Sequence, residues 1–278
     1  MDVRTALKQG QDLLDDAKIT APRLTAEVLL AHAIGCDRAW LFAHSDEELR
    51  EVWWIHYGRY LHQRMQGIPT QYITGRQEFY GREFRVTPDV LIPRPETEHV
   101  IEAALQLVTN HRLKPVPRVL DIGTGSGAIA VTLALETGAR VLATDISSAA
   151  LSVARENARR LGAKVEFVNC DLAGALAGGF DLVASNPPYV PETESLPREV
   201  REQEPAVALY GGADGYEIYR RLIPEAARLL RPGGWLVMEL GYRSREAVVE
   251  MLGDWRDVEV LTDLAGLPRV VMAADKRR

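Results

Sequence analysis

The N-terminal part of the chain carries apolar residues at the spacing of amphipathic helices. They recur every three or four positions from Val3 to Ala17, and a second apolar stretch runs from Ala26 to Ile34. Such periodicity places apolar side chains on one face of each helix. Residues 45–48, Ser-Asp-Glu-Glu, have the form of a capping box, so we expect a third helix to begin there. Because glycine is sparse and no strand pattern is evident, residues 1–70 are predicted to form a small all-α domain.

Short β-like runs replace the helical pattern between residues 71 and 95. The runs Tyr72–Ile73, Glu78–Tyr80 and Phe84–Val86 are rich in aromatic and β-branched residues and are separated by glycines. This arrangement is typical of a β-hairpin, and we expect a hairpin linker here. A helix should begin near Pro95, because proline suits the first helical turn and the acidic residues that follow complement the helix dipole.

Strands and helices alternate from residue 117 onwards, as they do in a parallel α/β sheet. Short apolar runs mark the strands, and longer amphipathic segments mark the helices. The predicted strands cover residues 118–121, 141–144, 165–168, 180–185, 235–240, 258–261 and 269–272, and the predicted helices cover 128–135, 149–161, 216–230 and 244–252. The chain is therefore expected to contain an α/β domain after the helical one.

The composition is that of a folded protein without an excess of basic residues. Hydrophobic residues make up 46% of the chain and charged residues 26%, which are ordinary values for a globular protein. The 33 Lys and Arg residues against 39 Asp and Glu residues give a formal charge of −6. Most nucleic-acid binders carry the opposite sign, so we expect no stable complex with nucleic acid. Residues 192–204 hold five Glu against two Arg and are predicted to form a solvated acidic loop.

The cysteines and the apolar runs favour a cytoplasmic location. Cys36 and Cys170 stand far apart, and neither they nor the six histidines show the spacing of metal ligands or of a disulfide framework. The first ten residues lack the apolar core of a signal peptide, and no run of about 18 apolar residues occurs. We expect a protein of the reducing cytoplasm that contacts no membrane and binds no metal.

A glycine-rich loop lies between a predicted strand and a predicted helix at residues 121–127, Asp-Ile-Gly-Thr-Gly-Ser-Gly. Glycines let the backbone turn sharply and let a ligand approach closely, and free N–H groups at a helix start attract an anionic group. A nucleotide-like ligand is implied, although dinucleotide-binding dehydrogenases satisfy the same pattern. Asp145, at the end of the next strand, suits ribose hydroxyls in either case.

Asp121 favours S-adenosylmethionine over a dinucleotide. It stands two residues before the first glycine, where a carboxylate either accepts hydrogen bonds from the loop or faces a cationic amino group of the ligand. A pyrophosphate would be repelled there. S-adenosylmethionine has an ammonium, a sulfonium and a ribose but no phosphate, so it is the better match.

A second loop, Asn186-Pro187-Pro188-Tyr189, follows the strand at 180–185. It lies at the carboxyl end of the sheet, where open α/β folds bind ligands, and its prolines fix the backbone. Such rigidity suits methylation of an amide or aryl amine nitrogen, a poor nucleophile that must be held in orientation. The Asn186 oxygen and the Pro187 carbonyl would each accept one N–H, which favours positive charge on the nitrogen, and Tyr189 would pack against the flat group.

These motifs carry a family resemblance. Residues 121–127, Asp145 and Ser-Asn-Pro-Pro-Tyr at 185–189 resemble the class I S-adenosylmethionine-dependent amino-methyltransferases. Residues 69–98, with Q-Y-I-T-G, E-F-Y-G-R-E-F and V-L-I-P-R-P-E-T-E, are similar more narrowly to the HemK-type protein-glutamine methyltransferases, which modify peptide chain release factors. The similarity runs over essentially the whole chain without a departure at a motif position.

The resemblance implies a fold and a reaction. The fold is a mostly parallel, seven-stranded, Rossmann-like methyltransferase domain at 96–278, preceded by the β-hairpin linker at 71–95 and the helical domain at 1–70. The reaction is methylation of the glutamine side-chain nitrogen in the Gly-Gly-Gln motif of release factors, with S-adenosylhomocysteine as product. We expect the helical domain to dock the protein substrate, because it is a separate fold, and we expect a monomer.

The family's site residues carry over onto matching positions of this sequence. The resemblance places Gly123, Thr124, Gly125, Ser126 and Gly127 against the methionine and adenosine parts of the cofactor, and Asp145 on the ribose. Asp171 and Leu172 would flank the adenine, with Leu172 replacing an aromatic residue. Asn186 to Tyr189 would hold the glutamine amide.

Three alternatives stay open from the sequence. A sister enzyme acting on a ribosomal-protein glutamine would share the core motifs. A DNA or RNA amino-methyltransferase would use the same Asn-Pro-Pro-Tyr chemistry on a flipped base, although the acidic balance counts against it. A non-catalytic module would bind the cofactor without turnover.

Overall fold

The computed structural model describes residues 1–276, which divide into two compact units. Unit 1 comprises Met1–Arg76 together with Pro197–Gln203, and unit 2 comprises Gln77–Leu196 and the chain from Glu204 onwards. The short segment 197–203 therefore packs with the N-terminal helices although it lies far along the chain. Within the described range, no helix is long and apolar enough to cross a bilayer.

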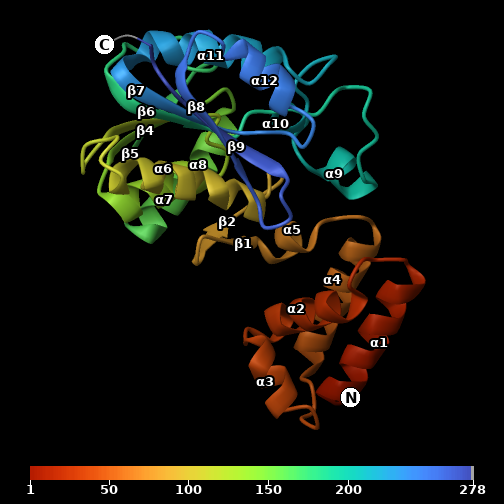
Figure 1. Ribbon diagram of the computed structural model, residues 1–278. Coiled ribbons are helices and arrows are strands. Elements are labelled where there is room, and N and C mark those ends of the chain that lie inside the picture. The colour runs from red at the N-terminus through yellow and green to blue at the C-terminus, as the bar shows by residue number, and fades with distance from the viewer. Residues whose placement is uncertain (277–278) are drawn as a thin grey trace. The chain divides into compact units, whose positions relative to one another are not determined.

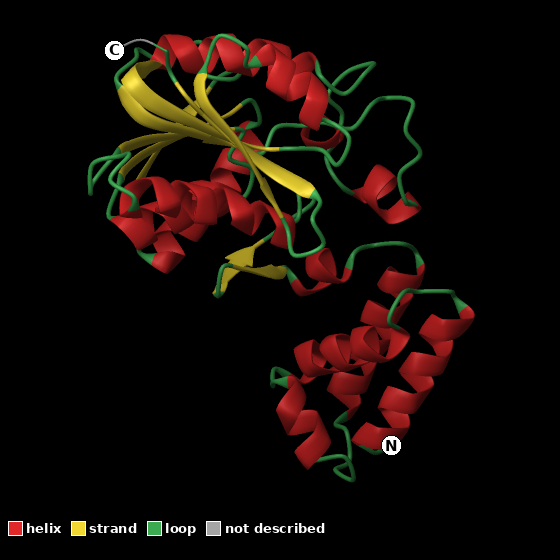
Figure 2. Cartoon of the chain, in the orientation of Figure 1, coloured by secondary structure: helices red, strands yellow, loops and turns green. Residues whose placement is uncertain are grey.

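Unit 1 is helical, as the apolar periodicity predicted (Figures 1 and 2). Its core contains the fully buried side chains of Leu29, Leu30, Leu41 and Tyr57. Tyr57 packs against Gly10, where an added Cβ would lie 1.9 Å from the phenol oxygen. The helices are α1 (Val3–Asp16), α2 (Pro22–Ile34), α3 (Arg38–Ala43), α4 (Glu51–Met65), α5 (Thr70–Thr74) and α9 (Arg198–Gln203).

Two local predictions in unit 1 were wrong. The helix expected from Ser45 begins at Glu51 instead, because residues 45–49 form a turn and an isolated bridge that are hydrogen-bonded to the N-terminal residues. Backbone N–H groups of Val3 and Arg4 donate to the carbonyls of Glu47 and Ser45, so this segment is not free to cap a helix. The run Tyr72–Ile73, predicted as β, lies in α5, which starts after Pro69 and ends at Gly75 in the left-handed conformation.

Unit 2 contains the predicted seven-stranded sheet, with strand order β5-β4-β3-β6-β7-β9-β8. All neighbouring strands are parallel except β9, which runs antiparallel to β7 and β8. The strands are β3 (Arg118–Ile122), β4 (Arg140–Asp145), β5 (Val165–Asn169), β6 (Phe180–Ser185), β7 (Leu230–Glu239), β8 (Arg256–Thr262) and β9 (Pro268–Ala274). A separate hairpin of β1 (Arg76–Phe79) and β2 (Arg82–Arg85) confirms the strands of the predicted linker.

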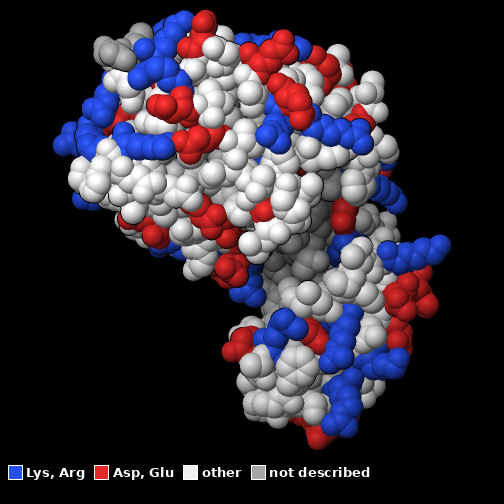
Figure 3. Space-filling view, in the orientation of Figure 1, with Lys and Arg blue, Asp and Glu red and all other residues white. Residues whose placement is uncertain are grey.

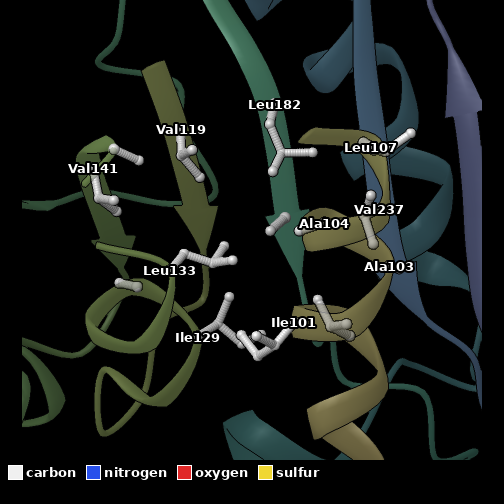
Figure 4. Close-up of a cluster of buried hydrophobic side chains, with 14 of the residues drawn as sticks. Ile101, Ala103, Ala104, Leu107, Val119, Ile129, Leu133, Val141, Leu182 and Val237 are labelled. Atoms are coloured by element: carbon white, nitrogen blue, oxygen red, sulfur yellow. The ribbon is translucent and has the colours of Figure 1, made fainter. Parts of the chain in front are cut away.

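Helices cover both faces of the sheet, because successive side chains of a strand point to opposite faces. On one face α6 and α7 pack against Val119 and Leu182 (Figure 4), and on the other α11 and α12 pack against Leu120 and Val183. The remaining elements of unit 2 are η1 (Pro95–Thr97), α6 (Glu98–Thr109), α7 (Ala128–Thr137), α8 (Ser148–Leu161), α10 (Ala206–Leu209), α11 (Glu217–Leu229) and α12 (Arg245–Met251). The α/β fold predicted from the alternation is confirmed.

The segment 192–204 is only in part the solvated acidic loop that its charge predicted, since Glu192, Glu194 and Glu202 are exposed but other residues of the segment are not. It contains the helix α9, and the side chain of Glu204 is only 2% exposed. Glu204 accepts a hydrogen bond from the Ile92 backbone and forms an ion pair with Arg94. A buried carboxylate is tolerated where it is paired in this way, which net charge along a sequence does not reveal.

Candidate active site

The two predicted loops follow neighbouring parallel strands. Ile122, the last residue of β3, lies opposite Ser185, the last residue of β6. The Ser185 hydroxyl donates to the Ile122 carbonyl at 2.7 Å and ties the strand ends together. The strand order reverses direction between β3 and β6, which is where open α/β sheets bind ligands. The glycine loop and the Asn-Pro-Pro-Tyr loop therefore flank one cavity.

The glycine loop needs its glycines for backbone conformation. Gly123, Gly125 and Gly127 have φ values of 74°, 55° and 85°, in the left-handed region. A Cβ added at Gly123 or Gly125 would meet no atom within 4 Å, whereas one at Gly127 would lie 3.2 Å from the Ala154 Cβ. The first two glycines thus leave open space beside the loop, and the third also permits close packing of α7 on α8.

Asp121 lies beneath the loop and not in the cavity. It is fully buried, and its Oδ2 accepts hydrogen bonds from the Thr124 hydroxyl at 2.6 Å and the Ala130 backbone at 3.1 Å. Its Oδ1 has no hydrogen-bond partner among residues 1–276. Burial raises the pKa of Asp121 to about 7. Two roles were considered for this carboxyl: accepting hydrogen bonds from the loop, or facing a cationic amino group of the ligand. The observed contacts agree with the first role.

Asp145 does line the cavity, at the carboxyl end of β4. Its Oδ2 accepts from the Gly125 N–H at 2.8 Å and its Oδ1 from the Ser147 N–H at 2.9 Å. Burial raises the pKa of this carboxyl, and the backbone hydrogen bonds oppose the shift. Each oxygen keeps a further lone pair, so the carboxylate can also accept from ligand hydroxyls.

An apolar slot lies next to Asp145. Leu172 and Ile146 both line the cavity, and Ile146 is 56% exposed, so it offers apolar surface to a ligand there. Leu172 has a φ of 47°, which a residue with a Cβ adopts only under constraint. Asp171 lines the same region and pairs with Arg221 at 2.5 Å. Asp171 and Leu172 were predicted from the sequence, but Ile146 was not. Its position directly after Asp145 could have indicated that it lines the cavity.

Asn186 and Pro188 line the cavity from the other loop, whereas Pro187 and Tyr189 stand behind it. The Asn186 Nδ2 donates to the Thr97 hydroxyl at 3.0 Å. In the part of the chain that the structure describes, the Asn186 Oδ1 has no hydrogen-bond partner. The amide therefore presents a free acceptor on a residue that lines the cavity.

Glu239 is a further residue that sequence reasoning missed. It ends β7, is 2% exposed, and accepts from the Thr97 hydroxyl at 2.5 Å and from the Tyr189 hydroxyl at 3.2 Å. Burial raises the pKa of Glu239 to about 7 and raises that of Tyr189 above its ordinary value. The available signal was an acidic residue directly after the apolar run Trp235–Met238.

Most of the sequence-predicted site residues lie on one surface. The cavity is lined by Gly123, Thr124, Gly125, Ser126, Asp145, Asp171, Leu172, Asn186 and Pro188, together with Thr97 and Arg94, which were not predicted. Asp121, Gly127, Pro187 and Tyr189 are adjacent to lining residues but do not line the cavity. The arrangement combines a nucleotide-type loop, a carboxylate for hydroxyls and an oriented amide.

Comparison with known protein families matches both units. A family described as the PrmC N-terminal domain matches residues 5–75, and one described as the methyltransferase small domain matches residues 98–202. Among solved structures, a methyltransferase from Pyrococcus furiosus is similar to this chain with a TM-score of 0.52 at 21% identity. That similarity covers 70% of this chain and 90% of the other, and it concerns the fold alone.

Curated relatives are similar over nearly the whole length. The release factor glutamine methyltransferase of Koribacter versatilis is 46% identical over 282 residues, which is 98% of each chain. The protein of the same name from Moorella thermoacetica is 45% identical over 284 residues, again 98% of each chain.

Proposed function

The chain belongs to the family of release factor glutamine methyltransferases, and from this premise we propose that it methylates the side-chain amide nitrogen of a glutamine. The substrate is the Gly-Gly-Gln motif of peptide chain release factors, in translation termination. The observation that carries the proposal is the adjacency of the glycine loop and the Asn-Pro-Pro-Tyr loop at the ends of β3 and β6. S-adenosylmethionine, when bound, supplies an electrophilic methyl group, and S-adenosylhomocysteine is the product.

The cavity residues fit S-adenosylmethionine better than a dinucleotide. Two arginines line the cavity, but Arg94 is paired with Glu204 and Arg221 with Asp171. Neither cation is thus left free for a pyrophosphate, which a dinucleotide would bring. We assign the ribose hydroxyls to Asp145, and the adenine to the apolar slot between Ile146 and Leu172.

The amide of the substrate glutamine would be held by the Asn-Pro-Pro-Tyr loop. The Oδ1 of Asn186, a residue that lines the cavity, accepts one of the N–H groups of that amide. We retain the Pro187 carbonyl as the acceptor of the other N–H; Pro187 does not itself line the cavity but stands between Asn186 and Pro188, which do. Two acceptors on one NH2 group fix its direction and stabilise the positive charge that grows on the nitrogen during attack. The nitrogen becomes acidic once it is alkylated, so the residues need supply no strong base.

The balance of charge supports a protein substrate over a nucleic acid. On the face shown in Figure 3, basic and acidic side chains are interspersed, in keeping with the net charge of −6. This face therefore lacks the large basic patch that attracts nucleic acids to their binders. Cys36 and Cys170 are free thiols, which is consistent with action in the cytoplasm.

The proposal is tested by incubating the protein with S-adenosylmethionine carrying a labelled methyl group and purified release factor. We expect label on the wild-type factor and none on a factor whose Gly-Gly-Gln glutamine is replaced by glutamate. An Asn186→Ala variant should bind the cofactor but lose most turnover. Label on the glutamate factor, on a ribosomal protein in preference, or on no protein at all would overturn the assignment.

A further inference from the structure

We propose that Thr97 and Glu239 are positioning residues that force the Asn186 amide to present its oxygen, and not its NH2 group, to the substrate. This inference rests on the proposed glutamine methylation and assigns to the site a selectivity for an amide over a carboxylate. The two residues come from η1 and β7, far from Asn186 in the sequence.

A continuous chain of hydrogen bonds carries the inference. The Asn186 Nδ2 donates to the Thr97 Oγ1 at 3.0 Å, and the Thr97 hydroxyl donates to the Glu239 Oε2 at 2.5 Å. The other carboxyl oxygen, Oε1, accepts from the Tyr189 hydroxyl at 3.2 Å. One carboxylate thus connects to both ends of the Asn-Pro-Pro-Tyr loop.

The protons available on these side chains fix which group donates and which accepts in each of these hydrogen bonds. An ionised carboxylate only accepts hydrogen bonds, so the single proton of the Thr97 hydroxyl is directed to Glu239. The lone pairs of that hydroxyl then face Asn186, which can satisfy them only with its NH2 group. A rotated amide would set two acceptors against each other, so the Asn186 Oδ1 must face the cavity.

Burial makes the preference strong. Thr97 is 4% and Glu239 is 2% exposed, so water does not compete for these hydrogen bonds. Glu239 forms no ion pair within residues 1–276, although a buried carboxylate without a cation lowers stability. Apolar side chains would fill the same space without that cost, which favours a role for Glu239 in the site.

A Thr97→Val variant tests the inference, because valine keeps the shape and removes the hydroxyl. We expect kcat on release factor to fall about 10- to 100-fold, because an Asn186 amide that is no longer held in one orientation loses its hydrogen bond to the reacting nitrogen. The dissociation constant for S-adenosylmethionine should hardly change, whereas the melting temperature should fall, because Glu239 and Asn186 each lose a buried hydrogen-bond partner. Thr97→Ser should restore kcat. The matched control is Thr132→Val, which removes another buried hydroxyl, one without a hydrogen-bond partner in residues 1–276.

Peptide binding gives a readout that a merely structural role would not move. In the presence of S-adenosylhomocysteine, the wild type should bind a Gly-Gly-Gln peptide more tightly than a Gly-Gly-Glu peptide. The Thr97→Val variant frees the Asn186 amide to present NH2, which donates to a carboxylate, so its preference should shrink or reverse. In an Asn186→Ala background the Thr97→Val change should alter neither kcat nor peptide preference, because the two residues act through one path.

The outcomes separate this inference from the proposed function. If the function is wrong, the wild type itself leaves the release factor unlabelled. If only the inference is wrong, the wild type is active and Thr97→Val keeps its kcat and peptide preference. The inference would also be overturned if Thr97→Val lowered kcat equally in the wild type and in the Asn186→Ala background, or if Thr97→Ser did not restore kcat.

Discussion

Asp121, a buried carboxyl group beneath the glycine loop, is expected to make the stability of the protein depend on pH. Burial raises its pKa to about 7, and only one of its oxygens is hydrogen-bonded within residues 1–276. The folded state therefore binds a proton that the unfolded chain, with an aspartate pKa of about 3.9, has already released. The stabilisation from this proton is complete below about pH 4 and is lost as the pH rises through about 7.

An Asp121→Asn variant should remove this dependence. Asparagine can still accept from Thr124 and Ala130 but never ionises. The free energy of unfolding of the variant, relative to that of the wild type, should therefore rise between pH 5 and pH 8 by about 1–3 kcal/mol. Denaturant unfolding without cofactor at both pH values measures the difference, and a difference independent of pH would contradict the prediction.

The protonation of Glu239 leads to a second prediction, which concerns the pH dependence of activity. Its pKa of about 7 reflects burial and the charge of Glu96, opposed by hydrogen bonds from Thr97 and Tyr189 and by the charge of Arg269. Above that pH the ionised carboxylate fixes the Thr97 proton, and below it a protonated Glu239 can donate to Thr97 and release the constraint.

We therefore expect kcat of the wild type to rise with pH through an apparent pKa near 7. A Thr97→Val variant, in which Glu239 no longer reaches Asn186, should lose this step. The measurement is kcat at saturating substrates from pH 5.5 to 8.5. A step that persists unchanged in Thr97→Val would mean that another group titrates.

At the scale of elements, helix propensity and packing conflict at Gly10 in α1. Alanine is a better helix former by about 1 kcal/mol, yet its Cβ at position 10 would lie 1.9 Å from the Tyr57 hydroxyl oxygen. We expect Gly10→Ala to destabilise the protein by about 1–3 kcal/mol, the usual cost of overpacking.

A substitution of Tyr57 separates the helix propensity of alanine from its steric overlap with the Tyr57 hydroxyl. The Tyr57 hydroxyl is buried without a hydrogen-bond partner in the described residues, so Tyr57→Phe alone should be neutral or stabilising. Combined with Gly10→Ala, it should recover part of the lost stability, because the shortest contact disappears. Thermal melts of the four proteins test this, and strictly additive effects would refute the contact.

The helices and strands could be predicted where a local sequence pattern determines them. They could not be predicted where residues far away in the sequence form contacts that change the local structure. The strand ending at Ile122 and the helix starting at Ala128 follow from local apolar runs and turn residues. The start of α4 did not, because residues 45–49 pair with the N-terminal backbone. Helix α9 likewise packs in unit 1, with Arg64 to Glu199 at 2.5 Å, which no local pattern announces.

The site residues also divide into those that a local pattern predicts and those that only the fold brings together. The two loops were predictable because glycines and prolines mark them, and the parallel sheet placed both at its carboxyl edge. Their adjacency depends on β3 and β6 being neighbours, which the sequence did not predict. Thr97 and Glu239 were not predicted as site residues. Thr97 lies in the family-typical run 69–98 and Glu239 follows an apolar run, but their common role becomes evident only when η1 and β7 meet at Asn186.

At the scale of the whole molecule, the helical unit has exposed apolar side chains that its own core does not use. Val52 and Ile55 lie one turn apart on α4 and are 52% and 59% exposed. We propose that they contact the body of the release factor, which would give the helical unit the docking role expected from the sequence. A short Gly-Gly-Gln peptide would lack that body.

Val52→Ser combined with Ile55→Ser should therefore raise KM for full-length release factor about 10-fold or more, since burying each side chain contributes about 1–2 kcal/mol. The value of kcat, and both constants for a short peptide, should stay unchanged, because the glycine loop and the Asn-Pro-Pro-Tyr loop lie in unit 2. Leu264→Ser, which removes a fully exposed leucine of unit 2, is the matched control and should have no effect. If the double variant weakens peptide and full-length substrate equally, or if Leu264→Ser raises KM as much, the docking role of α4 is refuted.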